Sequence, residues 1–312
     1  MGVTEVVVGT RPSALARRQT ERVIAQLRAA WPDLRCRVVT LTTEGDRLAE
    51  QPLPEIGGKG LFTQAIEAAL RSGEIDLAVH SLKDLPTAGA DDLIIGAVTE
   101  REDPRDVLIS RHGLPLQQLP TGARVGTSSL RRAAQVRALR PDMEVVPLRG
   151  NVDTRLRKAA RPDMDAVILA AAGVIRLGRA GEVTQWLPLD LMLPAPGQGA
   201  LAVQVRADDA ALLRWLAAIH HRPTWAAVTA ERAFLAALGA GCSAPVAAWG
   251  RVEAGRLWLD GLIASVDGRD VLRLSAQGDP DEPEALGAHL AEQARSQGAD
   301  RILEVGREHR RS

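Results

Sequence analysis

Short apolar segments alternate with longer amphipathic ones along the first third of the chain. The apolar segments have the length and the Val and Ile content of buried strands, whereas the segments between them, to about Ala30 and over 57–73, have helical periodicity. The predicted strands are 4–10, 35–43, 75–81 and 93–99. Strands that alternate with helices predict parallel pairing and an α/β domain.

The charged segment EREDPRD (100–106) breaks this pattern and is interpreted as a hinge. After it the alternation restarts, with predicted strands and helices at 123–128, 129–140, 143–149, 151–160 and 165–173. This restart predicts a second α/β domain of similar plan. The Pro- and Gly-rich segment 193–200 is a second break, and we expect the strand 201–206 after it to return the chain to the first domain.

From about Thr224 the pattern changes. A helix to Leu238 and a glycine loop precede three consecutive apolar segments, and a last helix begins at about Glu284. Consecutive strands flanked by helices predict a small α+β domain with an antiparallel sheet. The sequence therefore predicts two periplasmic-binding-protein-like α/β domains joined by a double-crossover hinge, plus a C-terminal α+β domain. The expected bounds are 1–100 with 200–217, 101–199, and 218–312.

Composition excludes several classes of protein. Hydrophobic residues make up 46% and charged residues 25% of the 312 residues, which is typical of soluble domains. No apolar run reaches the length of a membrane span, and the first residues lack the features of a signal peptide. Two cysteines, Cys36 and Cys242, are too few for a disulfide framework or a structural zinc site. We expect a cytoplasmic protein with no membrane contact and no metal.

The basic residues are unevenly distributed in type and in position. The net charge is zero, and only 3% of residues are aromatic, with no tyrosine, so the sequence does not predict a nucleic-acid partner. Of the 39 basic residues, only Lys59, Lys83 and Lys158 are lysines. A lysine that persists among so many arginines could mark a site that needs a compact ammonium, and the alternative is chance retention.

Cations recur where a predicted strand passes into a helix. Four such turns are GTRPS with Arg11 and Ser13, GGKG with Lys59, HSLKDLP with Lys83 and Asp84, and GTSSLRR with Thr127, Ser129, Arg131 and Arg132. N-capping explains the hydroxyl groups. It does not explain the arginines, because a helix N-terminus is already electropositive. An anion bound at these turns would stabilise them.

The second predicted domain carries a local excess of positive charge. Between residues 124 and 158 nine residues are basic and three are acidic, and Arg149, Arg155 and Arg176 follow predicted strands. Arginine binds carboxylates and phosphates through paired hydrogen bonds, so this excess favours a ligand with several such groups. A solvated helix face is the alternative for any single arginine.

Asp84 and Cys242 are the candidates for chemistry. Asp84 lies among the cations and either forms a salt bridge or acts as a carboxylate that stabilises a positive transition state or takes a proton. Cys242 lies in the glycine loop GAGCSAP, which suits the attachment of a covalently held group. A Cys–His hydrolase using His220 or His221 is a weaker hypothesis, because nothing in the sequence fixes their distance from Cys242.

Seven motifs in order resemble the porphobilinogen deaminase family, also called hydroxymethylbilane synthases. The resemblance runs from Val8 to at least Pro245. Its motifs are IGGKGLF (56–62), AVHSLKDLP (78–86), EREDPRD (100–106), GTSSLRR (126–132), LRGNVDTRL (148–156), GQGA (197–200) and TAERAFL with the later GC (229–242).

This resemblance implies a transferase that joins four porphobilinogen molecules head to tail with loss of ammonia and releases hydroxymethylbilane by hydrolysis. It implies a monomer with a dipyrromethane cofactor, bound to Cys242 through a thioether in a cleft between the first two domains, and it makes Asp84 the catalytic carboxylate. By the same resemblance the cofactor-binding residues are Lys83, Thr127, Ser129, Arg131, Arg132 and Arg155. The substrate-binding residues are Arg11, Ser13, Arg149 and Arg176, with Lys59, Phe62 and Gln198 as weaker candidates. A non-catalytic, two-lobed anion-binding protein remains the main alternative.

Overall fold

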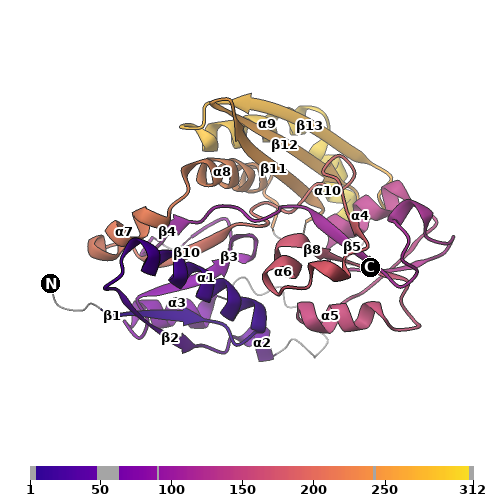
Figure 1. Ribbon diagram of the computed structural model, residues 1–312. Helices are drawn as coiled ribbons and strands as arrows, with labels where there is room; N and C mark the ends of the chain where they lie inside the picture. The colour runs from indigo at the N-terminus through magenta and orange to yellow at the C-terminus, as the bar shows by residue number, and fades with distance from the viewer. Residues whose placement is uncertain (1–4, 48–62, 90, 242–243, 309–312) are drawn as a thin grey trace. The chain divides into compact units, whose positions relative to one another are not determined.

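The computed structural model describes residues 5–47, 63–89, 91–241 and 244–308, and it divides into two compact units (Figure 1). The first unit comprises Met1–Glu102 and Ala200–Trp225, and the second comprises Asp103–Gly199 and Ala226–Ser312.

A five-stranded mixed sheet forms the centre of the first unit. Its order is β2 (Arg35–Thr40), β1 (Glu5–Thr10), β3 (Leu77–Ser81), β10 (Leu201–Arg206) and β4 (Leu93–Val98). β1 is parallel to β2 and to β3, as predicted, but β10 is antiparallel to both β3 and β4. Parallel pairing was predicted from the alternation of strands and helices, and β10 departs from it. This strand comes from far along the chain, so no local βαβ crossover fixes its direction.

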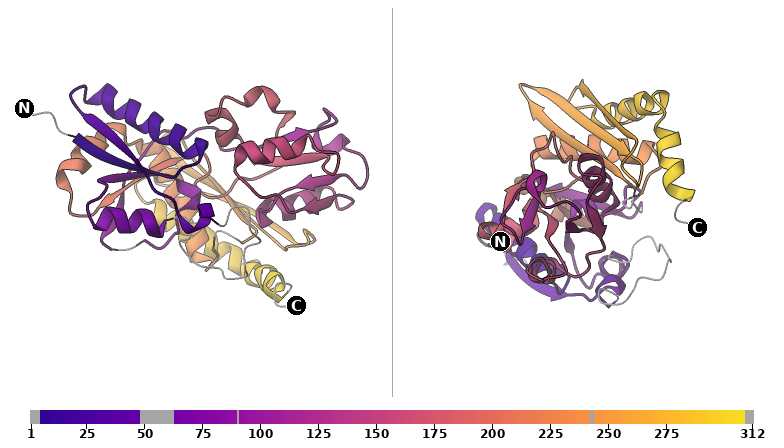
Figure 2. Two further views of the ribbon diagram at one scale, coloured as in Figure 1. Left: turned by 90° about the horizontal axis from the view of Figure 1, so that it is seen from below. Right: turned by 90° about the vertical axis from the view of Figure 1, so that its right-hand side faces the viewer.

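Helices cover both faces of this sheet, as Figures 1 and 2 show for α1 (Ala14–Ala30), α7 (Ala210–Leu216) and α3 (Gln64–Arg71). Apolar residues of α1 and α7 pack on one face with Val6 and Val8, and those of α3 pack on the other with Val7. The strand period of two directs neighbouring residues to opposite faces. A short helix, α2 (Glu44–Arg47), follows β2.

The second unit contains another five-stranded sheet. Its order is β7 (Glu144–Val146), β6 (Arg124–Gly126), β8 (Ala166–Ala170), β5 (Asp106–Ser110) and β9 (Gln185–Trp186). β6 is parallel to β7 and β8, whereas β5 is antiparallel to β8 and β9. The sequence analysis missed β5 and β9, and Asp106, which it assigned to the hinge, is the first residue of β5.

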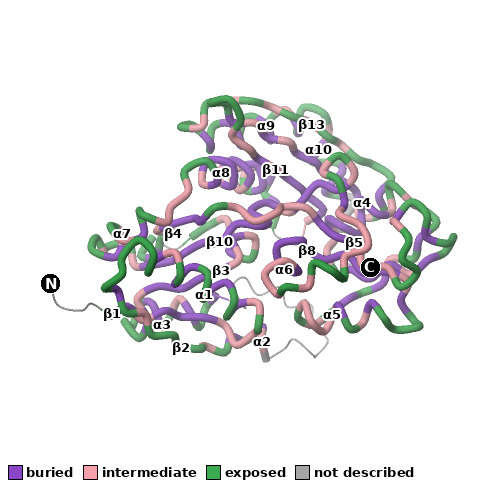
Figure 3. Tube along the Cα trace, in the orientation of Figure 1, coloured by how far each residue is buried: buried purple, intermediate pink, exposed green. Residues whose placement is uncertain are grey.

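Three helices pack on this sheet. α4 (Leu130–Leu139) packs on the face that carries Val125 and Ile168, and α5 (Val152–Ala159) and α6 (Ala171–Arg176) pack on the opposite face. The strand predicted over 165–173 is shorter than expected, because the residues after Ala170 begin α6. Figure 3 shows β5 and β8 as largely buried, in agreement with their exposed fractions.

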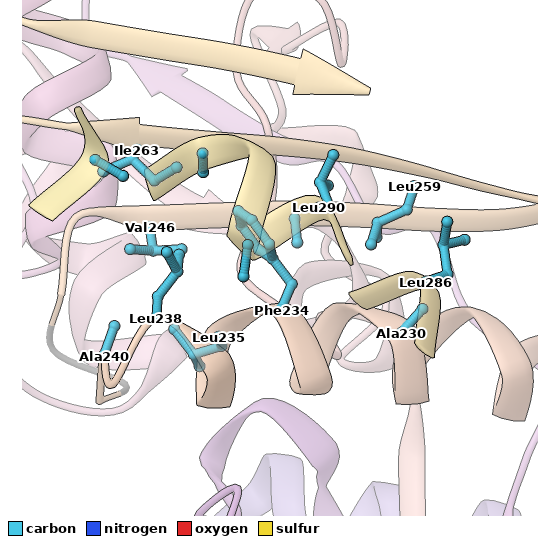
Figure 4. Packing of buried hydrophobic residues seen from close by; sticks show 14 of the residues in the cluster. Ala230, Phe234, Leu235, Leu238, Ala240, Val246, Leu259, Ile263, Leu286 and Leu290 are labelled. Carbon is cyan, nitrogen blue, oxygen red and sulfur yellow. The ribbon is translucent and has the colours of Figure 1, made fainter. Parts of the chain in front are cut away.

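An antiparallel sheet of β11 (Val246–Glu253), β12 (Arg256–Ala264) and β13 (Val271–Gly278) completes the second unit. Residues of three helices share its core: α8 (Arg222–Ala237), α9 (Pro283–Ser296) and α10 (Ala299–Glu308). Figure 4 shows Phe234 of α8 directed into this core beside Leu290. The predicted fold class is confirmed: two mixed α/β sheets are followed by a C-terminal antiparallel sheet.

Within the described ranges, every helix is too short or too polar to cross a bilayer.

Candidate active site

The predicted chemistry of the first unit gathers at one edge of its sheet. β1 and β3 are parallel, so their carboxyl ends meet at the same edge, where Arg11 follows β1 and Lys83 and Asp84 follow β3. Asp84 is the last residue of the short 3₁₀ helix η1 (Leu82–Asp84), and it is exposed. The structure thus places Arg11, Lys83 and Asp84 at the same edge of this sheet.

Arg11 pairs with a carboxylate that the sequence analysis did not foresee. Arg11 Nη2 lies 2.5 Å from Asp46 Oδ1 in α2, and Thr43 Oγ1 donates to Asp46 Oδ2 at 2.7 Å. Burial alone would raise the pKa of Asp46, but hydrogen bonds from Arg11 and Thr43 hold it below its usual value. The sequence predicted a bound anion beside Arg11 at the start of α1, and the carboxylate of Asp46 supplies part of that negative charge.

Two other polar residues of this edge have structural explanations. Ser13 caps α1, since its hydroxyl accepts the Ala16 N–H at 3.2 Å. His80 is buried in β3, and burial lowers its pKa to about 4, so it is neutral near pH 7.

In the second unit, the carboxyl ends of β6 and β8 also share one edge, and α4 begins there. The antiparallel strand β5 places its first residue at the same edge, because Asp106 pairs in register with Ala170, the last residue of β8. Sequence reasoning missed Asp106, whose position depends on a strand direction that the local pattern does not reveal.

Asp106 binds two of the predicted cofactor arginines. Its Oδ2 accepts from Arg131 Nη1 at 2.7 Å, and its Oδ1 accepts from Arg132 Nη2 at 2.7 Å and Nε at 3.1 Å. All three side chains are buried, with Asp106 0% exposed. Burial alone would raise the pKa of Asp106, but the charges of Arg131 and Arg132 hold it far below its usual value.

Gln198 also binds Asp106 and is itself 0% exposed. Its Nε2 donates to Asp106 Oδ1 at 2.9 Å and to the Pro104 carbonyl at 2.8 Å. The neighbouring Gly197 N–H donates at 2.6 Å to Glu231 of α8, a second buried carboxylate that the sequence analysis did not single out. Arg176 Nη2 donates to the Gly199 carbonyl at 2.6 Å. The segment 197–199 therefore links the cluster of Asp106, Arg131 and Arg132 to α8, which packs on the C-terminal sheet.

Close packing supports the same link. The Gly250 N–H donates to the other oxygen of Glu231 at 2.6 Å. A Cβ on Gly250 would lie 2.6 Å from the backbone oxygen of Ala227, a distance that only glycine permits. Glu231 thus joins the segment 197–199 to β11.

The predicted hydroxyl groups hold the start of α4. Ser129 is its N-cap, and its hydroxyl accepts from the Arg132 N–H at the long distance of 3.5 Å. Thr127 Oγ1 accepts from the Ser129 N–H at 3.2 Å and is buried. These bonds orient the turn that carries Arg131 and Arg132.

Arg149 and Arg155 flank the start of α5 on the same unit. Arg149 is exposed, and Arg155 Nε donates to the Gly150 carbonyl at 2.8 Å. Asn151 caps the helix, because its Oδ1 accepts from the Thr154 N–H at 2.9 Å. The cap fixes where the helix begins and hence where Arg155 lies.

We expect Asn151→Ala to lower the free energy of unfolding by about 1 kcal/mol, because the first turn of α5 loses its side-chain acceptor. Urea unfolding measures this loss. Asn151→Asp keeps an acceptor at the same place and is expected to unfold like the parent protein. Equal stability of all three proteins would contradict the role of the cap.

Three predicted site residues, Lys59, Phe62 and Cys242, lie outside the described residues. Within the described part of the chain, no group of three or more His, Cys, Asp or Glu side chains is placed to hold a metal ion.

The donor set fits an acidic ligand. Arg131 and Arg132 share the single carboxylate of Asp106, so this cluster retains one net positive charge. Arg131 Nε is buried and has no hydrogen-bond partner among the described residues. Carboxylate groups of a ligand supply the acceptors and the charge that such a cluster needs.

Comparisons with known proteins give a consistent result. Residues 6–214 match the family model described as porphobilinogen deaminase, dipyromethane cofactor binding domain, and residues 225–296 match porphobilinogen deaminase, C-terminal domain. Proteins named porphobilinogen deaminase from Moorella thermoacetica and Desulforudis audaxviator are each 52% identical to this chain. The first match covers 96% of both chains, and the second covers 96% of this chain and 97% of the relative.

A relative of the same name from Roseiflexus sp. is 48% identical over 96% of this chain and 98% of its own. Among solved structures, the methionine-binding protein MetQ is 13% identical and has a TM-score of 0.42, over 69% of this chain and 89% of that one.

Proposed function

The chain belongs to the porphobilinogen deaminase family, and from this premise we propose which of its residues carry out the reaction. The activity of the family is a transferase activity, that of hydroxymethylbilane synthase, in tetrapyrrole biosynthesis, and the family uses a dipyrromethane cofactor. This membership decides against the anion-binding protein and the hydrolase that the sequence left open.

The arginine cluster at the start of α4 is the proposed cofactor site. Each pyrrole ring of the cofactor carries carboxylate side chains, and the net positive charge around Asp106 is the single observation that best supports their binding here. Arg131, Arg132 and Arg155 would bind these carboxylates, with Lys83, Thr127 and Ser129 as further donors. Covalent attachment at Cys242 remains a proposal that rests on the family motif.

When bound, the dipyrromethane supplies the nucleophilic pyrrole carbon to which substrate is added. The protein's part is to hold acidic side chains and to balance charge. Arg11, Ser13, Arg149 and Arg176 are proposed to bind the carboxylates of porphobilinogen, since three of them are cationic. The first three follow strands, and Arg176 is the last residue of α6. Lys59 and Phe62 remain weaker proposals, and Gln198 is better explained by its bonds to Asp106 than by a ligand.

Asp84 is the proposed catalytic residue. Porphobilinogen that loses ammonia becomes a cation whose charge is shared by its pyrrole nitrogen. A carboxylate near that N–H stabilises the charge as it develops and could accept the ring proton released later. The position of Asp84 supports this role. The residue is exposed at the carboxyl edge of its sheet and lies next to Lys83, and it is not buried in an ion pair.

We propose the domain bounds 1–100 with 200–217, 101–199, and 218–312. The family models support a division between the first two domains together and the third, since they match 6–214 and 225–296. A monomeric state and a cytoplasmic location stay predictions.

Intact mass spectrometry tests the cofactor assignment. We expect the purified protein to exceed its chain mass by two pyrrole units, and we expect Cys242→Ser to have the bare mass. Cys36→Ser is the matched control, because it removes the other cysteine, in β2, and is expected to keep the adduct. An adduct that persists in Cys242→Ser would place the attachment elsewhere.

A further inference from the structure

Asp106 is a buried carboxylate at this site whose role family membership leaves open. It receives hydrogen bonds from three side chains, Arg131, Arg132 and Gln198, and is fully buried at the first position of β5. A buried ion pair is weak evidence for a stabilising role, because the cost of removing both charges from water offsets most of their attraction. The arrangement therefore calls for another explanation.

Each arginine is held at two points. Arg131 Nη1 donates both to Asp106 and to the Leu193 carbonyl, each at 2.7 Å. Arg132 donates through Nε and Nη2 to Asp106 and through Nη1 to the Ile168 carbonyl at 3.1 Å. Two attachments fix the plane of a guanidinium group, and a planar donor binds carboxylates in a defined direction.

The charge count indicates the same purpose. Two guanidinium groups against one carboxylate leave the buried cluster positive, and a buried charge without a counter-ion is costly unless a further anion binds it. The carboxylate lowers the repulsion between the two cations without cancelling their attraction for an acidic ligand. Arg131 Nη2 donates to no described residue, so part of this fork is not used within the described structure.

We propose that Asp106 is a positioning residue that orients Arg131 and Arg132 toward the carboxylates of the dipyrromethane cofactor. The inference rests on the proposed roles of the two arginines. Gln198 extends the arrangement, because its bond to Asp106 ties the cluster to the segment that Glu231 holds against β11.

Asp106→Asn tests the proposal. It keeps the size of the side chain but leaves two adjacent buried cations without a counter-ion. We expect the fraction of protein with the cofactor adduct to fall about tenfold or more, since a hydrogen bond to a charged group is worth at least that factor. The measurements are intact mass and thermal unfolding of the same preparation.

Asp165→Asn is the matched control. Asp165 precedes β8 at the opposite edge of the same strand pair and accepts from Arg111 at 2.6 Å and from His112 at 2.8 Å. Its pKa is lowered to about 2, first by the hydrogen bond from the Arg124 N–H and then by that from His112. We expect this variant to melt at a lower temperature than the parent and to keep its adduct.

Asp106→Glu distinguishes the effect of the negative charge from the effect of side-chain size. It restores the carboxylate but adds a methylene in a closed site, so we expect a lowered melting temperature together with partial recovery of the adduct. If the adduct instead followed melting temperature across Asp106→Asn, Asp106→Glu and Asp165→Asn, Asp106 would be only structural and the proposal would be wrong.

A second pair of variants covers the case in which Asp106→Asn does not fold. Arg131→Met and Arg131→Met/Asp106→Asn each keep one guanidinium, that of Arg132, and the double variant has no buried like-charge pair. We expect the double variant to hold markedly less adduct than the single one, and equal amounts would overturn the proposal.

If Arg131→Leu and Arg132→Leu themselves kept the full adduct, the proposed cofactor site would be wrong. If they lost it while Asp106→Asn kept it, only this inference would fail.

Discussion

Asp84→Asn is expected to reduce turnover about 10³-fold while leaving the fold intact, because loss of one well-placed charge partner in a transition state costs this much. Asp84 is exposed, so its substitution leaves no buried group without a partner. In water a charge pair at contact distance is worth only about 1 kcal/mol, and the interaction becomes strong when bound substrate excludes water. The loss should therefore appear in kcat more than in KM.

Steady-state kinetics with porphobilinogen and circular dichroism test this expectation. Asp84→Glu keeps the charge but displaces it and should fall between the parent and Asp84→Asn. Asp91→Asn removes an exposed carboxylate from the turn before β4 and should leave turnover unchanged. Near-normal kcat in Asp84→Asn would remove Asp84 from the mechanism.

The positions of the cations were predictable because they depend on a local rule. A strand followed by a helix directs the intervening turn to the carboxyl edge of a sheet, and Arg11, Lys83 and Arg131 follow strands that the apolar pattern identified. The hydroxyl of Ser13 likewise caps its helix, as its position alone indicated.

The carboxylates that bind those cations were not predictable in the same way. Asp46 lies in a helix of four residues after β2, and Asp106 lies at the start of a strand that runs against its neighbour. Both reach the site through tertiary structure, which no periodicity encodes. An arginine at a helix start therefore does indicate a nearby anion, but the protein itself provides part of that negative charge.

Strand direction accounts for the remaining misses. β10 and β5 both join their sheets antiparallel, and each brings its first residues to the edge where the functional turns lie. A pattern of alternating strands and helices predicts parallel pairing and gives no sign of such a strand. The fold class could be read from the sequence, but the residues that support the site required the structure.

Arg131→Leu and Arg132→Leu are each expected to reduce retention of the cofactor adduct to a small residual fraction and to destabilise the protein. Each substitution removes a donor for the ligand and also leaves Asp106 with one buried cationic partner in place of two. Breaking a buried ion pair costs about 3–5 kcal/mol. The two effects are separable, because adduct is measured by intact mass and stability by urea unfolding.

Arg155→Leu separates the two effects. Arg155 is half-buried, and its Nε donates to the neutral carbonyl of Gly150. We expect this variant to lose adduct with little loss of stability. Arg161→Leu removes an exposed ion pair with Asp163 and should change neither quantity, since surface pairs contribute about 0–1 kcal/mol. A role in cofactor binding requires Arg155→Leu to lose the adduct while it remains folded. If the adduct were lost only in variants that also lose stability, the arginines would support the fold and would not bind the cofactor.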